Sequence, residues 1–556
     1  MDNKTPNEDK SDEFPKIKVD LDNILIEEIG QFGKYQIKIL VYTLAAVLFS
    51  GFHAEYVFTT ARINTRCFIP ECEIDPSTSE YAPSWILNAV PGSGDSFDSC
   101  QRFASSNYSA GWDDACPANL FDRNTLIDCD AHVYEHQHTV VYDFDLACDE
   151  WRRSLIGFVR TFGTLVALPI TGYISDRWGR KTALTFNAVN TAWLGVIRYW
   201  ANTYLLFTLS EVIEAIFGAG VFSCTYILVL ELVGPKYRVI AGAILSSTFA
   251  LGQMCMGFIA WGVPDWRHLT LALYIPQFIT IAYWWILSES VRWYMTKGRY
   301  EESEALLKQV AAVNGKQLSA KSLEALRRTA EEEKKRKAVE KLNKKHEPLL
   351  IVQVFRNKRI LIRCLISPIW WITMTFVYYG LSINAVNMSG NSYLNYVAVA
   401  AAEIPGFWLS VFLMERVGRK PVLMGGFWMC GICQIAYIFI PNDIYGLSLT
   451  VYLIGKSSIS VVVTALYVYT TELYPTKYRH NLFAFSSMVG RIGSITAPLT
   501  PAIGDSTFDD LPFVLFATFA LLSGMLMFFT PETLGTKLPD TMAEASDLGY
   551  KKNEVK

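Results

Sequence analysis

One arginine interrupts an otherwise apolar stretch near the C-terminus of this sequence. Arg491 stands near the middle of SSMVGRIGSITAPL (residues 486–499), which has the small-residue composition of a membrane helix. An unpaired cation at that depth costs about 2.5–3.5 kcal/mol on insertion scales, and such residues usually mark a pathway. We therefore expect Arg491 to face protein or water rather than lipid.

Two more ionisable residues fall in apolar stretches of the same half of the chain. Glu403 lies in AAEIPGF and Lys456 in LIGKSSIS. A carboxylate at this depth would attract an ammonium group. Two roles fit Lys456 equally well: it neutralises Glu403 or another acid, or it lines a pathway.

The N-terminal half contains a second group of charges in apolar stretches, namely His53, Glu55, Arg160, Glu211 and Glu214. Structural ion pairing is the role we expect for them. A proton-sensitive site made of His53 and Glu55 is the alternative, because histidine titrates near neutrality. Their spacing of two residues places them on different faces of a helix, which counts against it.

The composition defines the elements that must position these residues. The 556 residues are 51% hydrophobic and 14% aromatic, with a mean hydropathy of +0.21, which is too apolar for a soluble protein of this length. A net charge of −3 is too small to indicate a nucleic-acid partner. About twelve runs are long enough to cross a bilayer core of roughly 30 Å. They begin near residues 37, 153, 182, 203, 239, 268, 360, 393, 421, 446, 481 and 511.

The basic loops predict the orientation in the membrane. The basic loops follow every second run, so they all lie on the same side of the membrane. They are SDRWGRK, GPKYR, the long segment after the sixth run, ERVGRK and PTKYRH, and VPDWRH on the other side is an exception. Short cationic loops resist translocation, so this side is cytosolic. The N-terminal MDNKTPNEDKSDEFPK has no apolar signal-peptide core. We expect both termini in the cytosol.

Six of the eleven cysteines lie between the first two runs: Cys67, Cys72, Cys100, Cys116, Cys129 and Cys148. An even set in a polar loop indicates disulfides formed in an oxidising compartment, although fifteen pairings are possible. A zinc site is the less favoured alternative, because Cys-x-x-Cys spacing is absent. Asn107 (NYS) is an expected glycosylation site, whereas Asn387 (NMS) lies too near the membrane.

The chain contains a long internal repeat. SDRWGRK (175–181) returns as MERVGRK (414–420), ELVGPKYR (231–238) returns as ELYPTKYR (472–479), and SESVRW is echoed by TPETLG. Three matched motifs in one order predict two six-helix halves in the same orientation, an architecture similar to that of major facilitator transporters.

Acidic and basic residues recur together in these motifs. We expect them to form inter-helix ion pairs that close the inner mouth as a gate: Asp176, Arg180, Glu231, Arg238, Glu289 and Arg292 in the first half, and Glu415, Arg419, Glu472, Arg479 and Glu532 in the second. The alternative, charges that are merely solvated and set the topology, fits the basic residues but not the repeated acids.

These observations divide the chain into seven parts. We predict a cytosolic N-terminal segment (1–36), a first helix (37–61), an extracellular cysteine-rich loop (62–151), five further helices (152–288), a charged cytosolic helical segment (289–358), six more helices (359–530) and a cytosolic tail (531–556).

The loop, the charged segment and the strings GYISDRWGRK, YWWILSESVRWY, TELYPTKYR and RIGSITAP together resemble the organic cation, organic anion and carnitine transporter family of the major facilitator superfamily. The resemblance extends from about residue 28 to about residue 548. SESVRW departs from the family's Pro-Glu-Ser-Pro-Arg-Trp, and Glu211 and Glu214 stand where many relatives carry arginine and glutamine.

The resemblance implies alternating-access transport of small organic ions through a central cavity. Cation-selective relatives carry aspartate at the position of Arg491, whereas anion and carnitine transporters carry arginine, so Arg491 is expected to bind a carboxylate. Trp371 and Tyr378 match aromatic positions that line the family's cation pocket. Phe407 stands where anion-selective relatives carry lysine, and this difference weakens the assignment of a purely anionic substrate.

We therefore expect a plasma-membrane transporter of small organic cations and zwitterions, with Arg491, Trp371, Tyr378, Glu403 and Lys456 as the substrate site. The alternatives are an organic anion exchanger that uses Arg491 and Lys456, and a receptor or scaffold without transport. No P-loop, soluble catalytic carboxylate pair or metal motif appears, so neither enzymatic activity nor a metal or cofactor is expected. The partners expected are the organic ion and membrane lipid, and the coupling ion is left open.

Overall fold

The computed structural model of the chain describes residues 21–93, 96–106, 116–324, 326–328, 331, 335, 350–441, 444–476, 478–536, 539 and 542–548. Within these ranges, eleven helical segments are long and apolar enough to cross a membrane. The twelfth predicted crossing, from about residue 182, is present as helix α7 (Arg180–Ile197), although it is not among those eleven. Observed helices begin within a few residues of the predicted positions.

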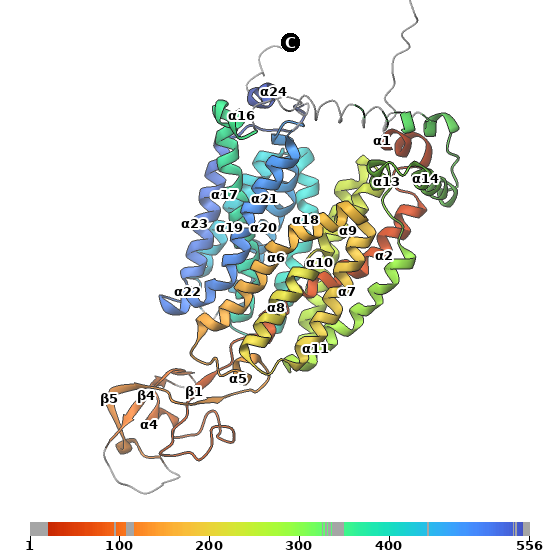
Figure 1. Cartoon of the computed structure of the whole chain (residues 1–556). Coiled ribbons are helices and arrows are strands. Elements are labelled where there is room, and N and C mark those ends of the chain that lie inside the picture. Colours follow the sequence, from red (N-terminus) through yellow and green to blue (C-terminus); the bar gives the residue numbers. More distant parts are fainter. Residues whose placement is uncertain are drawn as a thin grey trace, which may run out of the picture.

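The first half of the chain forms one bundle of helices (Figure 1). Its members are α2 (Lys34–Ser50) continued by η2 (Gly51–Ala54) and α3 (Tyr56–Thr59), α6 (Glu150–Trp178), α7, α8 (Tyr204–Gly218) continued by α9 (Val221–Leu232), α10 (Arg238–Gly262), and α11 (Trp266–Tyr274) continued by η6 (Ile275–Ala282) and α12 (Tyr283–Ile286).

The second half forms a matching bundle beside the first (Figure 1). Its members are α17 (Lys358–Asn384), α18 (Ser392–Arg416), α19 (Arg419–Phe439), α20 (Tyr445–Leu473), α21 (Arg479–Thr496) followed by η9 (Ala497–Leu499) and α22 (Thr500–Ser506), and α23 (Leu511–Leu526).

Polar residues cap the starts of several of these helices, where backbone N–H groups lack partners within the helix. The side chain of Asp149 accepts from the N–H of Arg152 at 3.0 Å at the start of α6. Asn391 accepts from the first turn of α18 in the same way. Local sequence therefore sets where these membrane helices begin.

The two bundles touch along α10 and α18 and along α6 and the α21–α22 corner. Phe58 at the end of the first crossing packs on Tyr396 of α18, with ring centroids 4.9 Å apart. The indole N–H of Trp408 donates to the Ser247 hydroxyl at 3.1 Å. At the opposite corner, Arg62 pairs with Asp505 at 3.2 Å.

The cysteine-rich loop forms a small unit at one end of the molecule, which we call the loop end (Figure 1). It is built from antiparallel pairs of short strands. They are β1 (Thr65–Cys67) with β6 (His132–Tyr134), β2 (Gly92–Ser93) with β3 (Ser96–Phe97), and β4 (Gln101–Ser105) with β5 (Phe121–Asp128). The guanidinium of Arg66, fully buried, donates to Glu73 at 2.9 Å inside this unit.

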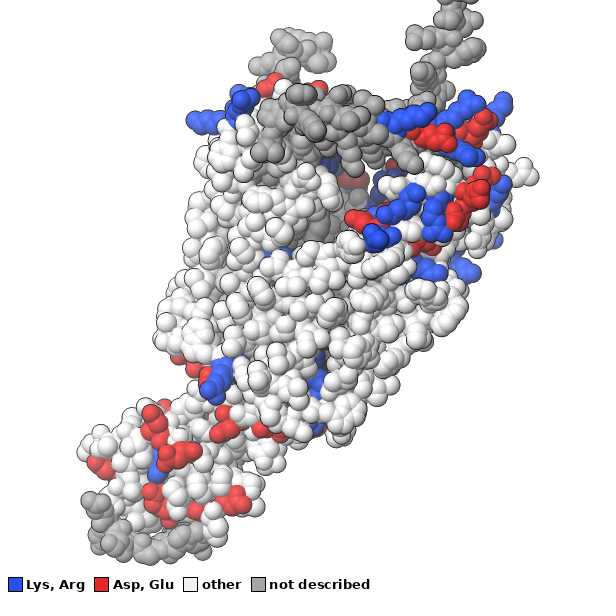
Figure 2. Space-filling model, viewed as in Figure 1, with Lys and Arg blue, Asp and Glu red and all other residues white. Residues whose placement is uncertain are grey.

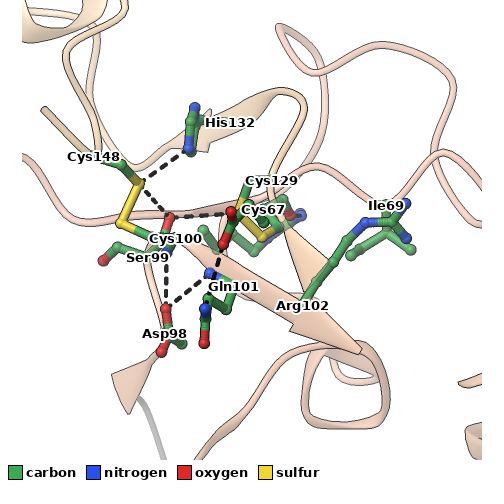
Figure 3. The surroundings of a disulfide bond; sticks show 12 residues. Cys67, Ile69, Asp98, Ser99, Cys100, Gln101, Arg102, Cys129, His132 and Cys148 are labelled. Atoms are coloured by element: carbon green, nitrogen blue, oxygen red, sulfur yellow. Dashed lines mark hydrogen bonds between the residues drawn. A yellow bond between two sulfur atoms is a disulfide. The ribbon is translucent and has the colours of Figure 1, made fainter. Parts of the chain in front are cut away.

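All six loop cysteines form disulfides. The pairs are Cys67–Cys129, Cys72–Cys116 and Cys100–Cys148. Figure 3 shows the first and third of them close together, next to His132, whose Nε2 lies 3.2 Å from the Cys148 sulfur. The structure thus selects one of the fifteen possible pairings, and the zinc alternative is not supported. Asn107 lies outside the described residues.

The opposite end, which we call the tail end, carries the short helices α1 (Leu21–Ile24), η1 (Leu25–Ile29), α13 (Val291–Lys297), α14 (Tyr300–Asn314), α16 (Leu350–Arg356) and α24 (Met542–Asp547) (Figure 1). The charged segment after residue 289 thus contains the helices α13, α14 and α16 within its described residues. The Asn314 side chain accepts from the N–H of Tyr35 at 2.9 Å, which ties this segment to the first crossing.

Candidate substrate chamber and its ion pairs

The repeated motifs build the same structure at the tail end of each bundle. In the first bundle, the Glu289 carboxylate accepts from the backbone N–H groups of Arg180 and Lys181 at 2.8 and 3.2 Å, at the start of α7. An anion at a helix N-terminus is stabilised by those N–H groups and by the helix dipole. Burial nevertheless raises the pKa of the Glu289 carboxyl, because its effect exceeds that of the backbone N–H groups, which lower the pKa.

The second bundle repeats this arrangement with Glu532. Its carboxylate accepts from the N–H groups of Arg419 and Lys420, each at 3.0 Å, at the start of α19. The Arg419 side chain pairs with Glu472 of α20 at 3.2 Å, as Arg180 pairs with Glu231 of α9 at 3.3 Å. The internal repeat predicted from the sequence is therefore present in three dimensions.

The remaining predicted gate residues are not equivalent. Asp176 pairs with Arg180 at 2.8 Å, whereas its counterpart Glu415 is exposed. Arg238 and Arg292 both reach Asp22 of α1, the former at 2.7 Å. The Arg479 guanidinium donates to the carbonyl of Tyr474 at 3.3 Å. The pairs Asp176–Arg180, Arg180–Glu231 and Arg419–Glu472 each join helices of the same bundle.

Glu403 and Lys456 form a buried ion pair inside the second bundle. Glu403 Oε1 lies 3.0 Å from Lys456 Nζ, and both side chains are fully buried. The Tyr378 hydroxyl donates to the other carboxylate oxygen at 2.6 Å. The ammonium also donates to the Tyr378 carbonyl at 2.8 Å and lies 3.6 Å from that residue's ring centroid. Of the two roles open from the sequence, the structure shows Lys456 neutralising Glu403.

The side-chain amide of Gln253 links this ion pair to the first bundle. Gln253 of α10 donates to Glu403 at 3.4 Å and accepts from the Tyr396 hydroxyl at 3.4 Å. Gln253 and Tyr396 were not singled out in the sequence, where no charge or motif marks them.

Trp371 belongs to an aromatic group on three helices. Its ring lies 4.7 Å from that of Tyr467 on α20 and 5.4 Å from that of Phe483 on α21. The indole N–H donates to the Thr470 hydroxyl at 3.2 Å, and only 2% of the residue is exposed. The buried Trp371 ring therefore packs against the Tyr467 ring.

Arg491 interacts electrostatically with Tyr467 of this aromatic group. The helix bearing it packs tightly against α17, because Gly490 and Gly493 allow the backbones of residues 371 and 372 to approach. Across the described part of the chain, no carboxylate lies within 4 Å of the Arg491 guanidinium. The side chain is partly exposed.

Tyr467 has accessible surface and interacts with the first bundle. Its accessible fraction is 39%. It interacts electrostatically with Tyr226 of α9 in the first bundle and with Tyr379 of α17, both partly exposed. Figure 2 shows the molecule hollowed between the two bundles toward the tail end. We call the space around Arg491, Tyr467, Tyr379 and Tyr226 the chamber.

The intramembrane charges of the first bundle form one buried cluster. Arg160 pairs with Glu211 and, at 2.7 Å, with Glu214. The structural pairing expected for these residues is thus observed. His53 contacts Glu214 at 3.3 Å rather than Glu55, and Glu55 pairs instead with Arg198. Arg198, which follows the last residue of α7, was not singled out in the sequence.

Most of the chain matches the model of a known protein family. Residues 121–543 match the family model described as "Sugar (and other) transporter". The chain belongs to this transporter family. It is therefore a multi-pass membrane transporter, and the expected twelve-helix major facilitator fold is confirmed.

Members of the transporter family with curated names match over nearly the whole chain. An organic cation transporter protein of Drosophila melanogaster is 29% identical over 95% of each chain. The organic cation/carnitine transporter 2 of Homo sapiens is 26% identical over 92% of each chain. These relatives agree with the resemblance drawn from the motifs.

The fold is also shared with a solved transporter. The xylose transporter XylE from E. coli, in a partially occluded inward-open conformation, superimposes with a TM-score of 0.56 over 91% of this chain and 100% of its own. At 17% identity, this likeness concerns the fold alone.

Proposed function

We propose that this transporter carries small organic cations and zwitterions across the plasma membrane by alternating access. The observation that carries the proposal is the guanidinium of Arg491, which has no carboxylate partner among the described side chains and interacts electrostatically with the accessible Tyr467. The names of the relatives, organic cation and organic cation/carnitine transporters, support the same substrate class.

Arg491 would bind the carboxylate of a zwitterionic substrate. A guanidinium presents two parallel donors that fit a carboxylate, and it cannot lose its charge. An unpaired cation inside a membrane protein is costly unless water or an anion reaches it. A substrate carboxylate would therefore complete the site.

Aromatic rings would hold the ammonium end. Tyr467, Tyr379 and Tyr226 line the chamber, and a cation over an aromatic face gains about 0.5–2 kcal/mol. Trp371, held by Thr470, fixes the orientation of Tyr467. Zwitterions such as carnitine place a quaternary ammonium within a few bonds of a carboxylate, which matches this combination.

Glu403, Lys456 and Tyr378 would shape the chamber wall rather than bind the ammonium directly. The Glu403 carboxylate is already matched by the Lys456 ammonium and the Tyr378 hydroxyl. Because Lys456 is fully buried in this pair, no observation favours the anion exchanger that needs a second free cation.

We further propose that the tail end, with both termini, faces the cytosol. The disulfides at the loop end and the basic motifs at the tail end support this orientation. The motif ion pairs hold together the tail end of each bundle, so that each bundle moves as one body. Their role as a gate that closes the inner mouth stays a prediction.

Uptake in expressing cells tests the substrate assignment. Labelled carnitine, tetraethylammonium and p-aminohippurate are compared for the wild type, Arg491→Asp and the control Arg152→Asp, whose side chain is 65% exposed. Losing a charge-assisted hydrogen-bonded pair costs about 1.5–3 kcal/mol, so carnitine uptake should fall about tenfold or more in Arg491→Asp. Tetraethylammonium uptake should survive or rise.

Cell-surface labelling of each variant separates lost transport from lost expression. Equal losses of carnitine and tetraethylammonium uptake, at normal surface levels, would show that Arg491 has a structural role. Uptake of p-aminohippurate alone by the wild type would instead favour the anion exchanger.

A further inference from the structure

The buried cluster of the first bundle carries more negative than positive groups. Its carboxylates are Glu55, Glu211 and Glu214, and its guanidiniums are those of Arg160 and Arg198. The three acids are fully buried, as is Arg198, and Arg160 is 3% exposed. With every group in its ordinary ionisation state, one negative charge has no counterpart.

An unbalanced charge in the interior of a membrane protein is costly. The corresponding pair of the second bundle, Glu403 with Lys456, is balanced. One proton taken up by the cluster would balance its charge, and the cluster itself contains a basic group that can acquire one.

That group is His53, in the η2 turn that interrupts the first crossing. Its Nδ1 lies 3.3 Å from Glu214 Oε1 and 3.4 Å from the Nη2 of Arg160. The same nitrogen thus faces one acceptor and one donor. When neutral it can accept from Arg160, and when protonated it can donate to Glu214.

The neighbours of the cluster within the described residues are hydroxyl groups, phenols and one amide. They are Tyr56 on the first crossing, Ser50 on α2, Thr191 on α7, Ser210 on α8, Tyr274 on α11, and Gln277 and Thr280 on η6. Nδ1 is the contacted atom, and Nε2 of His53 is buried without a hydrogen-bond partner in the described region. About a quarter of the His53 side chain is accessible.

We propose that His53 is the coupling-proton site of this transporter. One proton from water binds the imidazole, the resulting N–H at Nδ1 is donated to Glu214, and the cluster becomes neutral. Arg160 Nη2 then no longer has an acceptor at Nδ1, although Arg160 Nε still donates to the His53 carbonyl at 3.0 Å. Protonation thereby changes how the interrupted first crossing is held against α6 and α8.

This inference rests on the proposed transport of organic cations and zwitterions, and proteoliposomes test the two separately. Uptake of labelled carnitine and tetraethylammonium is measured without a gradient, with a proton gradient and with a sodium gradient. Coupling to one proton should let a gradient of one pH unit, about 1.36 kcal/mol, support up to about tenfold accumulation of a substrate whose movement carries no other charge. A pH-sensitive dye outside the vesicles should report proton entry upon substrate addition.

His53→Gln should keep exchange of substrate without a gradient and lose both the proton-driven accumulation and the dye response. Glu214→Gln, which balances the cluster without a proton, should do the same. The control His268→Gln alters an exposed histidine paired with Asp265 at the loop end and should behave like the wild type.

A proton-driven response that persists in His53→Gln would overturn the proposal, as would a wild type that responds to sodium and not to protons. Absence of any carnitine or tetraethylammonium uptake under all conditions would instead overturn the proposed substrate class.

Discussion

The ammonium of Lys456 lies 3.0 Å from the carboxylate of Glu403, and neither side chain is exposed. Together with the Tyr378 hydroxyl, this pair joins α17, α18 and α20 in the interior of the second bundle. It is electrically neutral as a unit, so each member depends on the other.

Removing one member should therefore be worse than removing both. Lys456→Met leaves the Glu403 carboxylate buried and unpaired, which should lower the free energy of unfolding by about 3–5 kcal/mol. The double variant Lys456→Met/Glu403→Gln should recover part of that loss. Thermal unfolding of purified protein measures both, with Lys308→Met, in an exposed pair with Glu304, as the control. Additive losses would contradict a coupled pair.

The glycines of the repeated motifs should not tolerate a side chain. Gly179 and Gly418 have φ of 110° and 112°, and a Cβ at Gly418 would lie 2.7 Å from Glu532, while one at Gly179 would overlap Glu289. Gly179→Ala or Gly418→Ala should each cost about 1–3 kcal/mol. Gly172→Ala, inside α6 with nothing within 4 Å, should be neutral or stabilising. Equal melting temperatures for all three variants would contradict this account.

Tyr467 should act through its ring. Tyr467→Leu removes an aromatic face worth about 0.5–2 kcal/mol to an ammonium, so KM for tetraethylammonium should rise by about 2- to 30-fold. Tyr467→Phe should retain most of the affinity. Concentration-dependent uptake measures KM, and the exposed Tyr173→Leu on α6 serves as the control. A similar loss in the Phe variant would point to the hydroxyl instead.

The loop disulfides should be detectable by mass spectrometry of protein digested without reduction. We expect the links Cys67–Cys129, Cys72–Cys116 and Cys100–Cys148 and no others within the loop. Double replacement of Cys100 and Cys148 by serine should destabilise the loop by about 2–4 kcal/mol and make it more sensitive to proteolysis. Unreduced protein should leave all six cysteines unreactive toward maleimide, and labelling of any of them would contradict complete pairing.

Local and periodic features could be predicted from the sequence because they depend on neighbouring residues. Long apolar runs define crossings whatever their partners, and Asp149 or Asn391 starts a helix through its own first turn. The repeat of SDRWGRK as MERVGRK already implied two like bundles, and the structure places Glu289 and Glu532 on equivalent helix starts.

Partners distant in sequence could not be predicted in the same way. Lys456 had two open roles, His53 was considered with Glu55 rather than Glu214, and Arg198 was not singled out. Tyr467, which opens into the chamber, is one of many aromatic residues in apolar helices. A membrane helix presents several faces of similar composition, so its sequence does not say which face meets which neighbour.

The sequence by itself thus determined the membrane class, the crossings, the repeat and the presence of buried charge. Only the tertiary structure decided which charges neutralise one another, which cysteines join and which rings face open space. The reason is physical: burial makes a charge need a partner, but the partner is fixed by how the helices pack.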